Sequence, residues 1–325
     1  TGNEILMRHG IPAAGNFLHQ ELAVMTGALE AMVVDVQCIM PSLAQLASCY
    51  HTKFISTSPK AKFPGACHIP LDEHHALDIA REIVRQAVET YPRRKKERVF
   101  IPRETAEYMA GFSAEAILKA LGGTLTPLIE AIKSKKIRGL AALVGCNNPK
   151  VPQDYNHINL AKTLIARDVL VVETGCAAIA SAKAGLLLPE AAELAGAGLA
   201  GVCRMLGIPP VLHMGSCVDI SRILAVCSAL AKELEVDIAD LPVAGVAPEW
   251  MSEKAVSIGA YVVATGIFTV LGTVPPVLGS KAVTEILTRT AKELTGGYFA
   301  VEADPFKAAE LIITHIEEKR AALGI

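Results

Sequence analysis

Short apolar runs alternate with longer stretches of mixed apolar and polar residues along this chain, most regularly after residue 139. A short apolar run bounded by polar or glycine positions predicts a buried strand, and apolar residues three and four positions apart predict a helix. Strands are predicted at residues 32–36, 53–56, 140–144, 169–173, 210–213, 243–246, 261–265 and 298–301. Helices are predicted at residues 7–31, 41–47, 72–91, 113–121, 125–134, 160–167, 177–186, 220–234, 248–258 and 306–321.

This alternation indicates a parallel α/β fold, because parallel strands need a crossover connection that is usually a helix. The charged, proline-containing segment at residues 91–104 is the best candidate for a domain boundary. We therefore predict two consecutive Rossmann-like parallel-sheet domains, the first at residues 1–98 and the second at residues 99–325.

The 325 residues are 51% hydrophobic and 20% charged, which is enough for sizeable buried cores. The 31 Lys and Arg residues nearly balance the 33 Asp and Glu residues, which argues against a nucleic-acid-binding protein. The basic run at residues 93–96 is interpreted as a solvated linker. The uncharged run at residues 255–280 contains several glycines and a Pro-Pro pair, so it predicts strand, loop and helix but no membrane span.

No signal peptide is recognisable, so a cytoplasmic location is expected. The chain starts at Thr1 and lacks an initial methionine, so we expect a fragment or processed product of a longer protein. In a reducing compartment the eight cysteines are better explained as catalytic or metal-binding thiols than as disulfides.

Four cysteines follow predicted strands closely, namely Cys38, Cys146, Cys176 and Cys217. In open parallel sheets, ligands bind beyond the carboxyl ends of the strands. A glycine precedes each of the last three cysteines by one or two positions and permits a tight turn there; these are Gly145, Gly175 and Gly215. The helices that follow direct backbone N–H groups at the same place, which favours thiolates. The sequence therefore predicts a site for a soft metal or an iron–sulfur cluster.

The other cysteines have simpler explanations. Cys203 and Cys227 lie within helical patterns and are interpreted as core thiols, while Cys49 and Cys67 are ascribed to core or loop. No two cysteines form a Cys-x2-Cys pair, which disfavours a zinc finger or ribbon.

Two further polar residues are candidates for the same site. Lys254 follows a predicted strand and is either a solvated side chain or a hydrogen-bond donor to an anionic substrate. His213 lies four residues before Cys217 and is either a donor that supports a metal ligand or a satisfied core histidine. Neither a Gly-x-Gly-x-x-Gly nor a P-loop fingerprint for nucleotides is present.

At these motifs the chain resembles the anaerobic nickel–iron carbon monoxide dehydrogenases. The matching stretches are Thr-Gly-Asn-Glu-Ile-Leu-Met-Arg-His-Gly (1–10), Val-Asp-Val-Gln-Cys (34–38), Cys-Tyr-His-Thr-Lys (49–53), Gly-Cys-Asn-Asn (145–148), Lys-Val-Pro-Gln-Asp (150–154), Thr-Gly-Cys (174–176), His-Met-Gly-Ser-Cys-Val-Asp (213–219), Glu-Lys-Ala-Val (253–256) and Leu-Thr-Gly-Gly-Tyr-Phe (294–299). They follow one another in order along the whole chain.

The resemblance implies a nickel–iron–sulfur cluster at the junction of the two domains. By position, Cys38, Cys146 and Cys176 match ligands of the cubane irons, and Cys217 matches the ligand of nickel. Lys254 matches the lysine that hydrogen-bonds the metal-bound carboxylate. Ile258 matches the apolar residue that shapes the gas pocket.

The resemblance also implies parts that lie outside this chain. The family's amino-terminal helical domain, its 4Fe–4S clusters and the Cys and His ligands of the pendant iron would precede Thr1. The implied reaction is CO + H2O to CO2 with two protons and two electrons, and the chain alone is expected to be inactive. Implied partners are a ferredoxin-like electron carrier, a second copy of the full-length chain and acetyl-CoA synthase.

Two alternatives stay open at this point. One is a hybrid-cluster enzyme of the hydroxylamine-reductase type, which has a related architecture without nickel. The other is a non-catalytic module that binds or assembles a cluster. The metal content of the protein distinguishes both from a nickel–iron enzyme.

Overall fold

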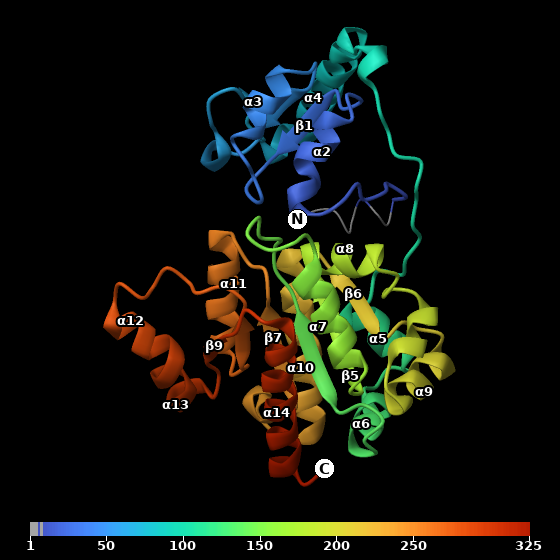
Figure 1. Ribbon diagram of the computed structural model, residues 1–325, viewed down its shortest axis with the longest axis vertical. Helices are drawn as coiled ribbons and strands as arrows, with labels where there is room; N and C mark the ends of the chain where they lie inside the picture. Colours follow the sequence, from blue (N-terminus) through green and yellow to red (C-terminus); the bar gives the residue numbers. More distant parts are fainter. Residues whose placement is uncertain (1–5, 7–8) are drawn as a thin grey trace. The chain divides into compact units, whose positions relative to one another are not determined.

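The structure is a computed structural model that describes residue 6 and residues 9–325 (Figure 1). It divides into two compact units, one made of Phe17–Thr105 and the other of Thr1–Asn16 with Ala106–Ile325. Both are α/β units in which every strand pairing is parallel, as predicted. The division predicted after residue 98 stays a prediction, because a compact unit need not be a separately folding domain.

The smaller unit is built on a three-stranded sheet with the order β1-β2-β3. Its strands are β1 (Ala31–Val34), β2 (Lys53–Ser56) and β3 (Cys67–His68). Its helices are α2 (Gln20–Met25), α3 (Leu43–Ser48) and α4 (Ala76–Thr90). Val24, Val34, Leu43 and Phe54 are buried between these elements and form a small apolar core.

The larger unit contains a six-stranded sheet with the order β6-β5-β4-β7-β8-β9. Its strands are β4 (Gly139–Leu143), β5 (Val169–Thr174), β6 (Val211–Gly215), β7 (Val243–Ala247), β8 (Thr269–Leu271) and β9 (Phe299–Val301). The chain runs outward from β4 to β6 and then returns to β7, so its direction of progress reverses between β4 and β7. In open α/β sheets such a switch point is where ligands bind, beyond the carboxyl ends of the strands.

The larger unit also contains helices before, between and after these strands. They are α5 (Ala114–Ala120), α6 (Thr126–Lys133), α7 (Tyr155–Ile165), α8 (Gly175–Lys183), α9 (Ala197–Leu206), α10 (Ile220–Leu234), α11 (Glu253–Ala264), α12 (Lys281–Glu285), α13 (Ala291–Thr295) and α14 (Pro305–Leu323). Helices α7 and α14 lie side by side (Figure 1). The short helices α12 and α13 are joined by a π-helical turn at Ile286–Thr290.

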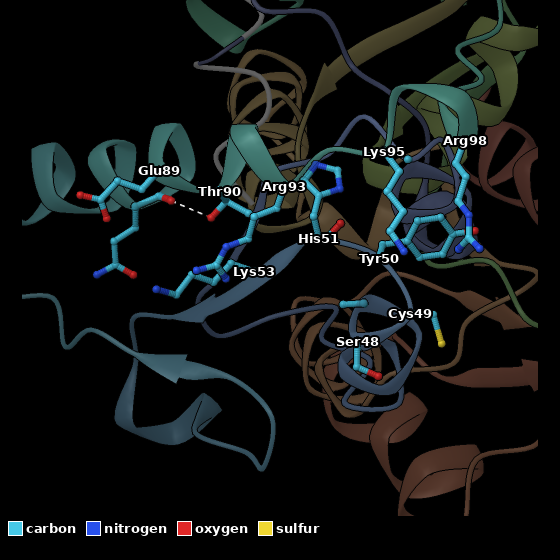
Figure 2. Close-up of a pocket in the computed structure, with 14 residues that line it drawn as sticks. Ser48, Cys49, Tyr50, His51, Lys53, Glu89, Thr90, Arg93, Lys95 and Arg98 are labelled. Carbon is cyan, nitrogen blue, oxygen red and sulfur yellow. Dashed lines mark hydrogen bonds between the residues drawn. The ribbon is translucent and has the colours of Figure 1, made fainter.

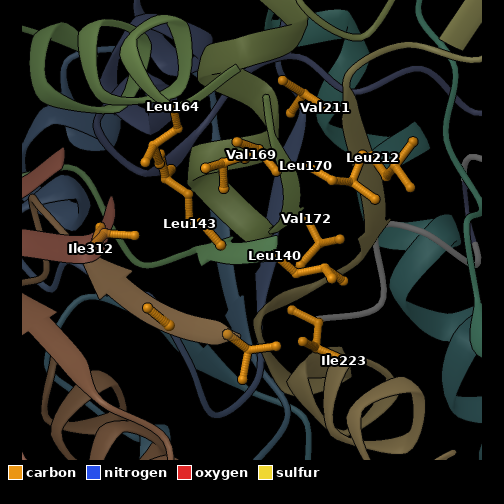
Figure 3. Packing of buried hydrophobic residues seen from close by; sticks show 14 of the residues in the cluster. Leu140, Leu143, Leu164, Val169, Leu170, Val172, Val211, Leu212, Ile223 and Ile312 are labelled. Carbon is orange, nitrogen blue, oxygen red and sulfur yellow. The ribbon is translucent and has the colours of Figure 1, made fainter. Parts of the chain in front are cut away.

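The core of the larger unit explains why its strands read as continuous apolar runs. Every residue of β5 is buried, because helices cover the sheet. On one face of the sheet Leu143 lies near Leu164 of α7, and on the other face Leu140 and Val172 lie near Ile223 of α10 (Figure 3). This rigid sheet fixes the positions of the loops that leave its carboxyl edge.

The helix predicted at residues 7–31 is wrong over most of its length. Within the described part of that segment, helical structure is confined to Phe17–Met25, and residues 7 and 8 lie outside the described residues. Gly10 has a φ of +78° and Pro12 lacks an N–H donor, so neither suits a helix interior. Gly27, with a φ of +66°, then ends the helical stretch before β1.

The strand predicted at residues 261–265 is also wrong, because that segment is the end of α11. The helix predicted at 248–258 starts later, at Glu253, and continues to Ala264. Tyr261, Val262 and Val263 favour strands intrinsically, but Val263 packs into an apolar cluster from the helix, and packing outweighs propensity. The strand of this region is β8, four residues farther on. No helix in the described part of the chain has the length and apolar character needed to cross a membrane.

Candidate metal centre

Three of the predicted thiols lie at the ends of three adjacent strands. Cys146 follows β4, Cys176 is in the first turn of α8 directly after β5, and Cys217 begins a 3-10 turn after β6. Strand β5 pairs with β4 on one side and with β6 on the other. The predicted gathering of these thiols at one edge of the sheet is therefore confirmed, while their role as ligands stays a prediction.

Glycine at position 175 makes room for the Cys217 thiol. Gly175 has a φ of +64°, which side chains other than glycine rarely adopt. A Cβ atom at this position would overlap Cys217 Sγ. The bare glycine therefore lets the turn after β5 approach the turn after β6 closely.

Replacing Gly175 by alanine is expected to displace the Cys217 thiol and reduce metal loading. The matched control is Gly185→Ala, since Gly185 has a similar φ of +72° but nothing lies within 4 Å of an added Cβ. Both variants should lose about 1–2 kcal/mol of stability from backbone strain. Only Gly175→Ala should also lose bound metal, measured as metal per chain, and equal metal contents in the two variants would contradict this account.

The loop that carries Cys146 is held from two sides. The hydroxyl of Ser252, just before α11, lies 3.4 Å from Cys146 Sγ. On the other side His157 Nε2 lies 2.8 Å from the Cys146 carbonyl oxygen. His157 is fully buried, and burial lowers its pKa despite the nearby Glu249 carboxylate, so the ring is neutral. A carbonyl oxygen can only accept, so Nε2 of the neutral ring must donate this hydrogen bond, and the ring proton is on Nε2.

Asp154 is the centre of a buried hydrogen-bond network beneath the thiol-bearing turns. Its Oδ1 accepts from Asn16 Nδ2 at 2.8 Å and from Asn147 Nδ2 at 2.8 Å. Its other oxygen pairs with the ammonium group of Lys183, at the end of α8. Asn16 also donates to the Cys176 carbonyl at 3.4 Å. The network thus joins the residue after Cys146 to α8, the helix whose first turn contains Cys176.

The charge state of Asp154 follows from its partners. Burial by itself would raise its pKa, but the hydrogen bonds from Lys183 and Asn16 hold the pKa below its usual value. Asp154 is therefore ionised at neutral pH. Its φ of +63° is one of a few positive values among non-glycine residues of the described chain, which shows that the surroundings hold it in a strained conformation.

Glu249 supports the Cys146 loop from the end of β7. Its carboxylate accepts from Asn147 Nδ2 at 3.2 Å and from the backbone N–H of Asn156 at 3.0 Å. Glu249 and His157 were not predicted as site residues, and Asp154 was named only as the last residue of a stretch that resembles the family. For Glu249 and His157 the only signal was a polar residue within an apolar strand–loop segment.

Glu173 is a second buried carboxyl group, on β5. Its side chain accepts a hydrogen bond of 2.9 Å from Ser181 Oγ, and its Oε2 has no partner among the described residues. Burial raises its pKa well above the ordinary value, more than the Ser181 hydrogen bond lowers it. The folded chain therefore favours the protonated acid.

Glu173 should make stability fall as pH rises above about 4.3, where a free Glu ionises. Because the folded-state pKa is raised, the unfolded chain ionises first and gains an advantage of about 1.4 kcal/mol per pH unit until the folded-state pKa is reached. Glu173→Gln should remove this component. Urea unfolding at pH 5 and pH 7 should show the variant gaining stability relative to the parent at the higher pH, and a difference independent of pH would contradict the assignment.

His213 is buried in β6 and has defined partners. Its Nδ1 accepts from the backbone N–H of Gly215 at 3.1 Å, so Nε2 carries the ring proton. The ring stacks on Tyr108, with centroids 6.2 Å apart and planes 4° apart. These contacts fix the turn that leads to Cys217, and a direct role in chemistry stays a prediction.

Lys254 and Ile258 lie one turn apart on α11, the helix that follows β7. Lys254 is half-buried in the first turn of this helix. Ile258 is half-buried and packs against the large apolar core. Because β7 is next to β4, both residues belong to the same edge of the sheet as Cys146, and their assigned roles stay predictions.

The remaining cysteines fall into separate groups. Cys38 belongs to the smaller unit, has a φ of +57° and accepts at its carbonyl oxygen from Gln20 Nε2 at 2.9 Å. Cys203 and Cys227 are buried in the large core as predicted, and burial raises their pKa values to about 11 and about 12. Cys49 is exposed and Cys67 is half-buried.

The thiols fit a cluster better than a single ion. In the described part of the chain, no three His, Cys, Asp or Glu side chains come close enough to hold one metal ion. A metal–sulfide cluster requires a different arrangement, since sulfide bridges its metals and each metal needs about one protein thiolate. Thiols on three adjacent strand ends, with Gly175 leaving space between two of them, suit that requirement.

Comparisons with known proteins assign the chain to a protein family. Its residues 1–306 match the model of the Prismane/CO dehydrogenase family. The chain is 68% identical, over all of its length, to 52% of carbon monoxide dehydrogenase 1 from Methanosarcina mazei. The chain therefore belongs to the Prismane/CO dehydrogenase family, and it spans about half the length of the curated relatives it matches.

Solved structures agree with this assignment. A nickel-free crystal structure of carbon monoxide dehydrogenase from Thermococcus sp. AM4, produced without the CooC maturase, matches with a TM-score of 0.94 and 60% identity over 99% of this chain and 51% of that one. A structure of acetyl-CoA synthase/carbon monoxide dehydrogenase with NiZn and NiNi Fe4S4 clusters in its alpha subunits matches with a TM-score of 0.93 and 44% identity. That match covers 100% of this chain and 50% of the other.

Proposed function

We propose that this chain, as a member of that family, supplies thiolate ligands to the nickel–iron–sulfur cluster of an enzyme that interconverts CO and CO2. The observation that carries the proposal is the placement of Cys146, Cys176 and Cys217 on three adjacent strand ends, at the carboxyl edge of the sheet and beginning at β4, which borders the switch point. The names of the relatives support the reaction. Cys38 is proposed as a further iron ligand on the resemblance alone.

The proposed roles of the thiols are distinct. Cys146 and Cys176 would bind irons, and Cys217 would bind nickel. When bound, such a cluster supplies a soft, electron-rich metal for CO and a second metal that makes water acidic. The chain holds the thiols in place through Gly175, Ser252 and the Asp154 network, so that little reorganisation is needed when the cluster is assembled.

The roles of the other candidates follow from their chemistry. The ammonium group of Lys254 would donate a hydrogen bond to negative charge that develops on the substrate oxygens. Ile258 would supply an apolar wall that suits a small, weakly polar gas. His213 would act as a positioning residue for the turn that carries Cys217, through the hydrogen bond that its Nδ1 accepts from Gly215.

Oxidation of CO to CO2 releases two electrons, which need an acceptor. We therefore also propose an iron–sulfur relay and a ferredoxin-like electron acceptor. A homodimer of the complete protein is proposed as well. The similarity to a chain of an acetyl-CoA synthase/carbon monoxide dehydrogenase structure supports acetyl-CoA synthase as a further partner.

Metal analysis under anaerobic conditions tests the proposal. The assembled protein should contain nickel together with several irons per chain and should oxidise CO with a viologen-type acceptor. An assembled, iron-loaded protein with no detectable nickel would contradict the nickel assignment and would favour a hybrid-cluster enzyme. A folded protein with neither metal would favour a non-catalytic module.

A further inference from the structure

A basic pocket of about 530 Å³ lies within the smaller unit, in the region where β2 begins (Figure 2). Four cations line it: Lys53, Arg93, Lys95 and Arg98. Tyr50 also lines it, and Figure 2 shows the side chains of Lys95 and Arg98 on either side of its ring. The volume lies within the range of small-molecule sites. Lys53 starts β2, so the pocket is at the amino edge of this sheet, whereas Cys38 follows the carboxyl end of β1.

The four cations lack partners within the described part of the chain. No hydrogen bond or ion pair joins the side chains of Lys53, Arg93, Lys95 or Arg98 to another described group. Arg94, in the same segment, differs, because its guanidinium binds Glu30 and the carbonyl oxygen of Ala28. In the segment of residues 93–98, Arg94 therefore stabilises the fold, while Arg93, Lys95 and Arg98 line the pocket.

The nearby carboxylates are already paired with other groups. Glu89, the carboxylate that lines the pocket, forms an ion pair with Arg85. Glu30 is bound by Arg94 and His51. The pKa of Glu82 is lowered first by its hydrogen bond from Arg85 and only weakly by the charge of Lys53. Little negative charge remains to balance the four cations.

The carboxyl ends of α3 and α4 neutralise only part of the positive charge of the four cations. Both helices end beside the pocket, at Ser48 and Thr90, and each helix carboxyl end carries about half a negative charge. Two half charges balance about one cation, so an excess of positive charge remains. A multiply charged anion relieves the mutual repulsion of these cations and forms charge-assisted hydrogen bonds with them.

We propose that this pocket binds a small ligand that carries a diphosphate or triphosphate group. The several negative charges of such a group can pair with four cations that come from two segments of the chain, whereas a single carboxylate has too little charge to do so. Two sources share this chemistry, a nucleotide and inorganic pyrophosphate. With a nucleotide, the ring of Tyr50 offers a surface on which a base packs. The basic run at residues 93–96 is then part of a binding site and not only a solvated linker.

Isothermal titration calorimetry of the purified protein at low salt tests the proposal with ADP, pyrophosphate, adenosine and inorganic phosphate. ADP or pyrophosphate should bind more tightly than inorganic phosphate, and adenosine should not bind measurably. Tighter binding of ADP than of pyrophosphate would identify the nucleotide as the source, and equal binding would identify pyrophosphate. The double variant R93A/K95A should weaken binding at least about tenfold, because charge-assisted contacts to both sites are lost.

The matched control is K60A/K96A, which removes two exposed cations of the same unit that do not line the pocket. It should leave binding unchanged, and far-UV circular dichroism should show both variants folded. The proposal is overturned when neither ADP nor pyrophosphate binds, when inorganic phosphate binds as tightly, or when both double variants weaken binding equally. The last result would indicate a diffuse attraction to basic surface, of the kind that an acidic protein partner uses.

Discussion

Cys217→Ala is expected to leave a folded protein that retains iron but loses nearly all of its nickel and its CO oxidation. The thiol follows β6 and lies against Gly175, where the turn after β5 leaves space for it. Changing residues that only support a metal ligand typically costs 10–100-fold in affinity or activity, so removing a ligand should cost more than about 100-fold. The measurement is nickel and iron per chain, together with CO oxidation, in the assembled protein.

The control for this prediction is Cys203→Ala. Cys203 is 1% exposed within the large core, and its raised pKa keeps the thiol protonated. Removing it should cost a small amount of stability through a cavity but should leave the nickel-to-iron ratio unchanged. A Cys217→Ala protein with the parent nickel content would show that nickel is held elsewhere or is absent from this centre.

The parallel sheets were predictable because their strands are short, apolar and separated by helical patterns. Buried β5 is the clearest case, since every one of its residues faces a covered surface. The pattern failed at residues 261–265, where strand-favouring residues are packed as the end of α11. Local propensity cannot register that packing, because it depends on residues of β8 and β9 that come later in the chain.

The candidate site was predictable to the extent that topology determines it. Thiols placed directly after parallel strands must lie at one edge of a sheet, so Cys146, Cys176 and Cys217 could be grouped from the sequence. The polar side chains that hold these thiols in place could not be predicted in this way. Asn16 and Asp154 are 138 residues apart, and their hydrogen bond follows from the packing of the whole unit. Long-range polar pairs of this kind have no periodic signal in a single sequence.

Asp154→Ala is expected to destabilise the larger unit and to reduce cluster loading at the same time. The substitution removes the Oδ1 acceptor that the amides of Asn16 and Asn147 share, and it removes the carboxylate that pairs with Lys183. Breaking a fully buried ion pair costs about 3–5 kcal/mol, but the Lys183 side chain is 36% exposed and can be hydrated, so about 2–3 kcal/mol is expected. Urea unfolding and metal content per chain are the measurements.

Asp154→Asn separates the charge of this residue from its shape. Asparagine accepts hydrogen bonds and tolerates a φ of +63° better than alanine does, so this variant should lie between the parent and Asp154→Ala. Because the folded-state pKa of Asp154 is lowered, its contribution is present above about pH 3.9 and is lost as the pH falls through the folded-state value. The stability difference from the parent should therefore stay constant between about pH 5 and pH 8.

A surface ion pair provides the control for the Asp154 variants. Asp78 pairs with Arg81 at 3.1 Å on an exposed face of α4, so Asp78→Ala should change stability by no more than about 1 kcal/mol and leave metal content unchanged. Asp154 differs from Asp78 in being buried and in joining two thiol-bearing segments. If Asp154→Ala loses stability but retains the parent metal content, the network supports the fold without positioning the thiols. If metal content falls in Asp154→Asn while stability does not, the charge itself is required for cluster loading.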